Sequence, residues 1–517
     1  MMGRQQRIQK KLFYTKFNLD QRVPKNHILR KVAKYIDFDF IYKEVKGKYG
    51  SNGNVSVPPA VILKMMLLLV FYNVRSEREL MNTIPVRLDW LWFLGYDLDD
   101  EIPNHSVLSK ARTRWGVAAF QAFFDRIVIQ CAHAGLVEGS KLFMDSSNIQ
   151  ADASNNSVVN KEDIKRYLKK SYLLFEKRLE KENIDNNDDD MNPPKTGVAN
   201  KKHFSTTDPD ASVHRQGGRS KLKYKVHRSV DEKHEIITAT TVTSGSVNEA
   251  HLLKPLLLDH ERITGGKPKV CVADSKYGII ENYLSCRDLD IKGHFESFEK
   301  VHRGSGRQKG IFPKEAFVYN PQTDTFICPE GKELRRRRFN KHRRQWEYTA
   351  PLSVCRNCSS FTKCTRSKTG RSLKRHERQN ELDAMLTHCE SKESQRDIRK
   401  RQHLMERSFA RSTRYGFKRA RWRRQWRVKI QELLTASLQN IMIYIRNVKD
   451  RPTTAAASCR TRPPKPCKAS NLVKLAAFLN IREHLIPWYV KMSTILCYQT
   501  ITVSIALGNS PLNIEAE

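Results

Sequence analysis

The chain shows two hydrophobic patterns, one with the period of helices and one with the alternation of strands. Residues 20–135 follow the helical period. Within them, the apolar run Val57–Tyr72 opens with two prolines, which are favoured in a first helical turn, and it predicts a helix. Ser76 and Glu79 have the spacing of a capping box and predict the start of the next helix.

A further helix is predicted from Val107 to Trp115, capped by Asn104 or Ser106. It carries three basic side chains, and helices joined by short turns and bearing basic side chains suit DNA binding. A helical domain that only packs against the rest of the chain is compatible with the same spacing.

The second pattern consists of short strands mixed with helices. Leu142–Asp145 and Val270–Ala273 are short apolar strands, and Tyr277–Cys286 follows the second one as a helix. Lys221–Val230 and Glu235–Thr243 alternate, contain β-branched residues and predict a hairpin around a polar turn. Such a mixture predicts an α/β sheet.

Other segments have distinct compositions. Lys161–Glu182 is charged and helical, and the acidic run Asp185–Asp190 behind it resembles a linker. Residues 300–395 are basic and contain cysteines, after which Arg396–Ile445 is again helical. From Arg451 onward we expect a linker and a poorly specified tail.

Charge narrows the class of partner. The 517 residues include 93 Lys and Arg and 55 Asp and Glu, so the net charge is 93 − 55 = +38. This excess is larger than solubility requires and favours a polyanion, nucleic acid in particular. A ribosomal protein or a protein at a membrane surface would show the same excess.

The sequence predicts neither secretion nor a membrane span. Met1–Lys11 is polar and basic, with no apolar stretch behind it. Ala60–Tyr72 is too short to cross a bilayer and contains Lys64, and Ile486–Leu507 is interrupted by polar residues. Eleven cysteines in such a chain indicate a reducing compartment, where they are thiols or metal ligands.

Three acidic residues end or follow apolar runs: Asp145, Asp274 and Glu406. Carboxylates brought together repel one another unless a divalent metal ion neutralises them. With so basic a chain, the expected chemistry is metal-dependent cleavage of a phosphodiester by Mg²⁺ or Mn²⁺. Asp152 competes with Asp145 for the first position, and Asp274 could instead cap the following helix.

The segment Arg411–Lys429 interleaves aromatic and basic residues with few acids. It predicts contacts to DNA phosphates, and base stacking on Tyr415, Trp422 or Trp426 is a weaker expectation. A solvated basic face with its aromatics in the core is the alternative. The cations assigned to DNA are Arg411, Arg414, Lys418, Arg419, Arg421, Arg423 and Arg424.

Four cysteines lie within the basic segment 300–395. Cys355 and Cys358 form a C-x-x-C pair, flanked by Cys328 and Cys364. Four thiols can close a tetrahedral Zn²⁺ site, although the spacing is looser than in a paired C-x-x-C knuckle. Ordinary reduced thiols are the alternative.

Together these motifs resemble bacterial insertion-sequence transposases of the DDE type, over about residues 10–447. The resemblance lies in several short blocks: Arg75-Ser-Glu-Arg-Glu-Leu80, Ile102-Pro-Asn-His-Ser106, Met144-Asp-Ser-Ser-Asn148, Lys223-Tyr-Lys-Val-His-Arg228, Gly245-Ser-Val-Asn-Glu-Ala-His251, Ala273-Asp-Ser-Lys-Tyr-Gly278 and Glu406-Arg-Ser-Phe-Ala410. Each block alone is weak, whereas the set is specific.

The resemblance implies a ribonuclease-H-like catalytic fold with Asp145, Asp274 and Glu406 as the metal-binding triad. It implies an enzyme that cuts double-stranded DNA at transposon ends and joins it to a target, acting in the bacterial cytoplasm at the nucleoid as a dimer or larger assembly. The expected domains are an N-terminal helical DNA-binding domain, two parts of the catalytic domain, a cysteine-bearing insertion and a tail: 1–135, 140–300 and 396–447, 301–395, and 448–517.

Two features depart from the resemblance. Relatives commonly carry a Lys two helical turns after the Glu, and the matching residue here is Thr413. The tail after Asp450 matches nothing in the resemblance. A catalytically inactive DNA-binding protein derived from a transposase is therefore the alternative function, and a host nuclease with the same fold is a third.

Overall fold

The computed structural model describes the part of the chain that carries all the candidate sites. The described residues are 2–3, 18–51, 53–160, 203–216, 219–296 and 310–448. The chain divides into two units, Met1–Val448 and Lys449–Glu517. The predictions for Lys161–Glu182, Asp185–Asp190 and the tail lie outside the described residues.

The N-terminal region is helical, as predicted. Its helices are α1 (Leu19–Arg22), α2 (Ile28–Tyr35), α3 (Phe40–Val45), α4 (Pro59–Phe71), α5 (Glu77–Thr83), α6 (Leu88–Leu94) and α7 (Ser106–His133). Helix α4 is apolar on nearly all sides and is almost completely buried. Ser76 is confirmed as the N-cap of α5, because its hydroxyl accepts a hydrogen bond of 3.1 Å from the Glu79 N–H.

Helix α7 is longer than the sequence predicted. The expected helix Val107–Trp115 is its first part, and the chain continues as a helix to His133 across a kink at Gly116. Gly116 has φ 68°, a left-handed conformation that glycine adopts at little cost. Beyond the kink, Phe120, Phe123 and Phe124 are buried, so the second part of α7 is anchored by core packing.

A mixed sheet follows α7. Its strands are β1 (Lys141–Gln150), β4 (Ser212–Gln216), β5 (Arg219–Asp231), β6 (Ile237–Ser244), β7 (Val270–Val272) and β8 (Lys292–His294). The order is β4-β5-β1-β7-β8, with β6 also paired to β5. Strand β1 is antiparallel to β5 and parallel to β7, which is parallel to β8. The predicted α/β sheet and hairpin are therefore confirmed.

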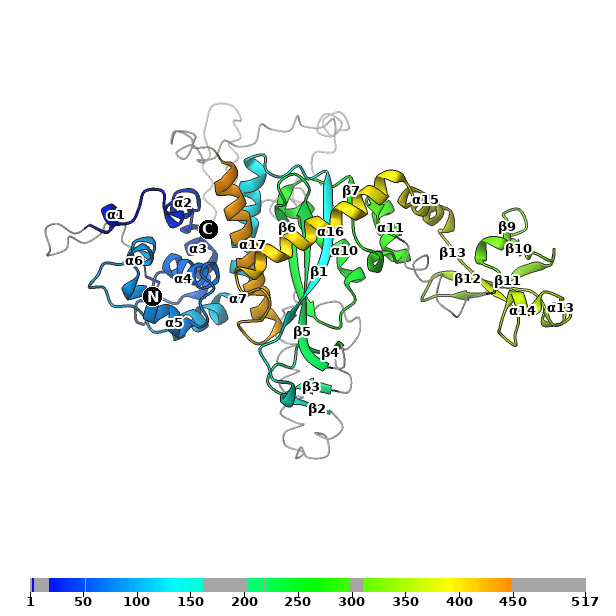
Figure 1. Cartoon of the computed structure of the whole chain (residues 1–517), viewed down its shortest axis with the longest axis horizontal. Helices are drawn as coiled ribbons and strands as arrows, with labels where there is room; N and C mark the ends of the chain where they lie inside the picture. The colour runs from blue at the N-terminus through cyan, green and yellow to red at the C-terminus, as the bar shows by residue number, and fades with distance from the viewer. Residues whose placement is uncertain are drawn as a thin grey trace, which may run out of the picture. The chain divides into compact units, whose positions relative to one another are not determined.

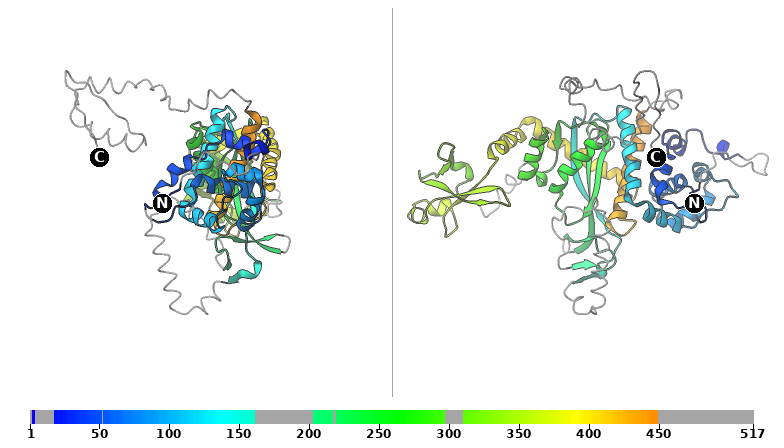
Figure 2. Two further views of the ribbon diagram at one scale, coloured as in Figure 1. Left: turned by 90° about the vertical axis from the view of Figure 1, so that its left-hand side faces the viewer. Right: turned by 180° about the vertical axis from the view of Figure 1, so that it is seen from behind.

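Helices cover both faces of this sheet (Figures 1 and 2). Helices α10 (Leu253–Thr264) and α11 (Ile280–Asp288) pack on the face to which Leu142 and Met144 point. Helices α16 (Lys392–Thr413) and α17 (Gln425–Asn447) share a core with Phe143 on the other face. Figure 1 shows α16 crossing the sheet over β1.

The cysteine-bearing segment forms a second sheet, which is antiparallel. Its strands follow the order β13-β12-β11-β10-β9: Ser372–His376, Gln345–Thr349, Glu333–Asn340, Thr325–Ile327 and Val318–Asn320. Short helices α13 (Leu352–Arg356) and α14 (Phe361–Cys364) lie between β12 and β13, and α15 (Gln379–Cys389) leads into α16. Its core is small and includes Phe326, Leu334 and Tyr348.

A two-stranded pair lies outside both sheets. Strands β2 (Val158–Asn160) and β3 (His203–Ser205) form a separate antiparallel pair. Within the described ranges, no helix combines the length and the apolar character that crossing a membrane requires.

One buried ion pair joins the sheet to both C-terminal helices. The guanidinium of Arg228 on β5 forms two hydrogen bonds with the Glu432 carboxylate on α17, of 2.7 and 2.9 Å. It also donates to the Ser412 hydroxyl on α16, at 2.8 Å. Both charged side chains are 0% exposed, so each charge depends on the other for compensation.

Removing one partner of this pair should unfold the protein more readily. Arg228→Met leaves the Glu432 carboxylate buried without its counter-ion, and we expect a loss of about 3–5 kcal/mol in the free energy of unfolding. Adding Glu432→Leu should recover part of the loss, because no buried charge remains. Urea unfolding measures both. The control Arg262→Gln removes an exposed cation paired to Asp125 and should cost under about 1 kcal/mol; an equal loss in Arg228→Met would contradict the prediction.

Candidate active site

Asp145 and Asp274 lie at the same level of the sheet. Strands β1 and β7 are paired in parallel up to Phe143 and Val272. Asp145 comes two residues after Phe143 and is still on β1. Asp274 comes two residues after Val272, just beyond the end of β7. The parallel register therefore brings the two predicted aspartates side by side.

The charge of Asp274 affects the pKa of Asp145. Burial raises the pKa of Asp145, and the negative charge of Asp274 raises it further, while Arg401 and the Ser146 N–H act in the opposite direction. Asp274 also caps the short helix Ser275–Tyr277 by accepting a 2.8 Å hydrogen bond from the Lys276 N–H. Asp274 therefore caps this short helix and not α11, which follows it with Ile279 at its N-cap, and the capping contact is compatible with a place beside Asp145.

An arginine from α16 provides the positive charge at this site. The Arg401 Nη1 atom lies 2.5 Å from Asp145 Oδ2, and the Ser146 N–H donates to Asp145 Oδ1 at 2.7 Å. The Arg401 side chain is only 12% exposed. Its Nε atom is buried without a hydrogen-bond partner among the described residues. The Arg401 guanidinium is thus the cation that pairs with Asp145.

Helix α16 is fixed in register one turn before Arg401. Asp397 accepts hydrogen bonds from Lys141 Nζ on β1, at 2.8 and 3.0 Å. It also lies 2.7 Å from His294 Nδ1 on β8. These contacts hold α16 across three neighbouring strands and set which of its side chains meets Asp145.

Glu249 is a site residue that the sequence reasoning did not single out. It lies in the turn Glu249–Leu252, is 6% exposed, and accepts hydrogen bonds from the Ser146 hydroxyl and from Lys276 Nζ, the latter at 2.9 Å. Burial alone would raise the pKa of Glu249, but these hydrogen bonds and the charges of Lys225 and Lys276 lower it overall. Glu249 does lie in the block Gly245–His251, which resembles transposases, and this resemblance was the signal in the sequence that could have pointed to it.

Three carboxylates approach the buried Tyr277. Its hydroxyl has no hydrogen-bond partner within the described part of the chain. Burial raises the pKa of Tyr277, and three negative charges raise it further: Asp145, Glu249 and Asp274. The charges of Asp145, Asp274 and Glu249 therefore gather near the ends of β1 and β7, where Arg401, Lys225 and Lys276 oppose them.

Glu406 stands apart from this pair in the present arrangement. It is exposed on α16 and accepts a 3.1 Å hydrogen bond from Gln402 Nε2. In the described ranges, no three Cys, His, Asp or Glu side chains converge where a metal ion could bind. The structure thus brings Asp145 and Asp274 together and does not add Glu406 to them. Thr413 is exposed at the end of the same helix.

The donor set nevertheless fits a hard divalent cation. Asp145 and Asp274 offer carboxylate oxygens, the ligands that Mg²⁺ prefers. Burial, with a further contribution from Asp274, raises the pKa of Asp145, so the ionised carboxylate needs a positive charge beside it. Arg401 supplies that charge here, so a divalent ion would satisfy the same electrostatic requirement.

The segment Arg411–Lys429 is more internally paired than predicted. Asp152 binds Arg419 at 3.0 Å and Arg423 at 3.4 Å, so this competitor for the first catalytic position serves as a counter-ion. Other predicted DNA-binding cations also have protein partners: Arg411 with Glu235, Arg424 with Asp210, and Arg421 with Asn73. The expectation of nearly unopposed charge is wrong for the four cations with carboxylate partners, Arg411, Arg419, Arg423 and Arg424, whereas Arg421 is held by a neutral amide.

Two of the seven candidate cations remain open to a ligand. Arg414 and Lys418 are exposed, and neither has an ion-pair partner in the described part of the chain. Tyr415, by contrast, is buried and stacks on Phe71, and the Trp422 indole donates to Glu77 at 3.0 Å. These two rings pack within the protein, so base stacking on them is not supported.

The four cysteines are close to one another. Burial raises the pKa of Cys364, and the thiols of Cys328, Cys355 and Cys358 raise it further. Cys328 begins a tight turn in which the Lys332 N–H donates to its sulfur at 3.2 Å. The chain thus brings all four thiols into one region, although the side chains do not converge on a single point.

Comparisons with known proteins agree with the motifs. The family described as Transposase domain (DUF772) matches residues 17–114, and the family described as Transposase DDE domain matches residues 327–445. The second match includes Glu406 and the four cysteines. A search of curated proteins found no significant match.

One solved structure is similar over most of its length. The cryo-EM structure of piggyBac transposase synaptic complex with hairpin DNA shares 10% sequence identity, with 87% of each chain covered. The TM-score of 0.23 is too low to establish a common fold. The matches to a transposase domain and to a transposase DDE domain, together with the motifs that run between them, support a DNA transposase of the DDE type.

Proposed function

We propose that this DNA transposase is catalytically active and that Asp145 and Asp274 hold its divalent metal ions. The observation that carries the proposal is the parallel register of β1 and β7, which sets the two carboxylates side by side. Burial, and to a lesser extent the charge of Asp274, disfavours an ionised Asp145, so a bound cation would stabilise this arrangement. The substrate is double-stranded DNA at transposon ends.

The fold proposed for the catalytic part is ribonuclease-H-like. Strands β6, β5 and β1 are antiparallel, and β7 and β8 continue in parallel with β1. This arrangement, with Asp145 on the central strand and Asp274 after its parallel neighbour, supports the fold that the family resemblance implies. We further propose that the enzyme acts as a dimer or larger assembly, since two ends must be joined.

The protein's own residues would position the reacting groups. Mg²⁺ or Mn²⁺, when bound, would activate the attacking oxygen and stabilise charge on the phosphate. Asp145 and Asp274 would hold the ion, with Glu406 as the proposed third carboxylate. Glu249 engages Ser146 and Lys276, which closely follow the two aspartates, and so fixes the backbone that carries them.

Arg401 is proposed as the counter-ion of the metal-free site. Its guanidinium neutralises Asp145, which leaves the site tolerable when no divalent ion is present. Arg401 and the metal ion would then compete for the same carboxylate.

We also propose that the four cysteines bind a structural Zn²⁺ ion. Their proximity and the N–H···S hydrogen bond to Cys328 support it, since backbone donors of this kind stabilise a thiolate ligand. The sheet that they border has a core of only six buried apolar residues. A metal ion would compensate for so small a core.

Replacing either aspartate should abolish cleavage and leave binding intact. A metal ion stabilises the transition state by several kcal/mol, so Asp145→Asn and Asp274→Asn should slow cleavage about a thousandfold or more. The assay is nicking of a supercoiled plasmid that carries the element's ends, with Mg²⁺. DNA binding in EDTA should stay near wild type, and Glu261→Gln, an exposed acid on α10, is the matched control.

The third carboxylate is decided in the same assay. Glu406→Gln should match the two aspartate variants. If Glu406→Gln cleaves normally while Glu249→Gln does not, the third role belongs to Glu249. A wild-type protein that binds the ends but does not cleave with either ion would favour the inactive DNA-binding alternative.

Loss of Arg401 should make stability depend on metal. In EDTA, Arg401→Gln leaves Asp145 without its counter-ion, and we expect about 1–3 kcal/mol less free energy of unfolding. Mg²⁺ should restore more of this stability than it adds to the wild type, as measured by thermal melting across a Mg²⁺ titration. The control is Arg407→Gln, an exposed cation on the same helix. An equal deficit with and without Mg²⁺ would make Arg401 a structural clamp only.

Purified protein should contain close to one equivalent of zinc. The double substitution Cys355→Ser, Cys358→Ser should remove it, because two of the four ligands are gone. Metal analysis by mass spectrometry checks both proteins, and Cys389→Ser, a buried cysteine outside the group, should keep its zinc. Wild-type protein without zinc after purification free of chelators would refute the proposal.

A further inference from the structure

The second sheet contains an unusually basic hairpin. We define the basic hairpin as residues 333–349, which form β11, its turn and β12. It contains seven Lys and Arg but only two acids: Arg335, Arg336, Arg337, Arg338, Lys341, Arg343 and Arg344 against Glu333 and Glu347. We therefore ask which of these cations have a carboxylate partner and which remain available to a ligand.

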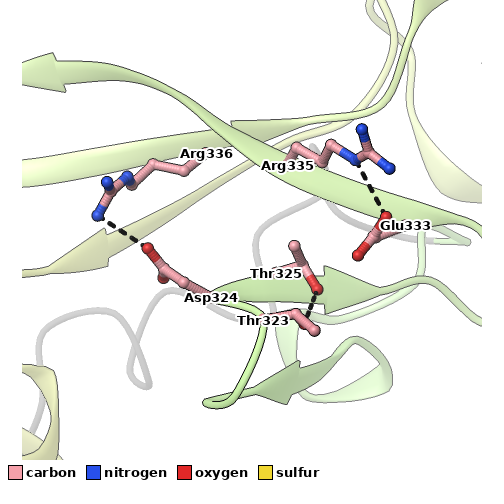
Figure 3. A pocket seen from close by; sticks show the side chains of 6 residues that line it. All are labelled: Thr323, Asp324, Thr325, Glu333, Arg335 and Arg336. Atoms are coloured by element: carbon pink, nitrogen blue, oxygen red, sulfur yellow. Dashed lines mark hydrogen bonds and ion pairs between the residues drawn. The ribbon is translucent and has the colours of Figure 1, made fainter.

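Three of the seven cations are neutralised within the protein. Arg335 pairs with Glu333 at 3.1 Å and Arg336 with Asp324 at 2.8 Å (Figure 3). Arg344 pairs with Glu377. The pocket of Figure 3 is therefore lined by arginines that already have carboxylate partners, and it offers no cation to a ligand.

The other four cations form what we call the tip set: Arg337, Arg338, Lys341 and Arg343. All four are exposed, and within the described residues none has an ion-pair partner. Like charges placed this close repel one another and destabilise the folded hairpin. A polyanion that binds the tip set would remove that cost.

The hairpin presents the tip set on a firm base. The rings of Phe339 and Trp346 pack at 4.7 Å across the two strands, and the Arg336 guanidinium lies 4.3 Å above the Trp346 ring. A bulge lies between Arg336 and Arg338, so Arg337 is left without a cross-strand partner. Phe339 and Trp346 thus pack within the hairpin, while the four cations of the tip set are exposed.

The base of the hairpin turn is tied to the catalytic sheet. The Glu377 N–H donates to the Arg344 carbonyl at 3.1 Å, just before α15. The adjacent Arg378 binds Asp288, at 2.5 Å, at the end of α11. Helix α11 follows Asp274 in the chain, so the tip set is linked through a few contacts to the element behind the second aspartate.

We propose that the tip set binds the phosphate backbone of duplex DNA during transposition. The inference rests on the proposed function, since it assumes that DNA lies along the catalytic domain. Four exposed cations without carboxylate partners suit phosphate groups, which every duplex offers, so we propose that the contact is independent of sequence. The cysteine-bearing sheet is then a second DNA-binding surface, separate from the N-terminal helices.

The test compares two full-length variants that each remove four positive charges. The hairpin variant carries Arg337→Gln, Arg338→Gln, Lys341→Gln and Arg343→Gln. The control variant carries Lys254→Gln, Lys267→Gln, Lys269→Gln and Lys292→Gln, four exposed lysines around α10, β7 and β8. Binding to a duplex of random sequence is measured in EDTA across a range of NaCl concentrations.

The hairpin variant should bind roughly tenfold or more weakly at moderate salt. Its slope of log K against log salt should fall by about 0.9 for each phosphate group that the variant no longer binds. The control variant should keep the wild-type slope. Equal reductions in both variants would show a general charge effect and overturn the proposal, as would an unchanged hairpin variant. A larger reduction for terminal-repeat DNA than for random duplex would also overturn it.

Plasmid cleavage by wild-type protein is measured in parallel. If the wild type binds DNA but does not cleave it, the proposed activity fails while the hairpin result stands. Zinc content and the thermal melting temperature of the hairpin variant should equal those of the wild type, because the four side chains lie on the surface. A shift in either would call for Arg338→Gln with Lys341→Gln alone, and full retention of binding in that variant would count against the proposal.

Discussion

The buried pair of Arg228 and Glu432 constrains the geometry of the catalytic part. Neither charge can be buried alone, so β5, α16 and α17 must meet in one register before the core can close. Arg228 is also the cross-strand partner of Asp145. The contact that sets the helices against the sheet is therefore adjacent to the first aspartate, and the structural and functional requirements on β5 coincide there.

The same register decides which cation meets the acidic site. Asp397 binds β1 and β8, and Ser412 binds Arg228, so α16 is held on both sides of Arg401. These contacts place Arg401 next to Asp145. A buried aspartate beside a second carboxylate favours such a charge, and under the proposed function a divalent ion would take the place of Arg401.

Local patterns in the sequence predicted the helices, the hairpin and the two aspartates, because strand alternation and capping depend on neighbours along the chain. The roles of Arg401 and Glu249 could not be predicted, since each depends on a register between segments more than a hundred residues apart. For Glu406, the hydrophobic period of α16 indicated a helix, but it did not show which face of that helix would point toward the two aspartates. Helix phase is fixed by contacts such as that of Asp397, which only the fold reveals.

The pairing of each cation within the protein distinguishes the candidate DNA contacts more finely than the density of positive charge does. The segment Arg411–Lys429 contains no acid of its own, yet Asp152 and Asp210, which come from remote parts of the chain, pair with Arg419, Arg423 and Arg424. The basic hairpin has fewer acids within reach, and the four cations of its tip set remain without protein partners in the described ranges. Because an internal ion pair must be broken before a phosphate can bind, unpaired cations carry the larger gain in binding free energy. The argument favours the tip set, with Arg414 and Lys418, over the paired arginines as the surface that DNA meets first.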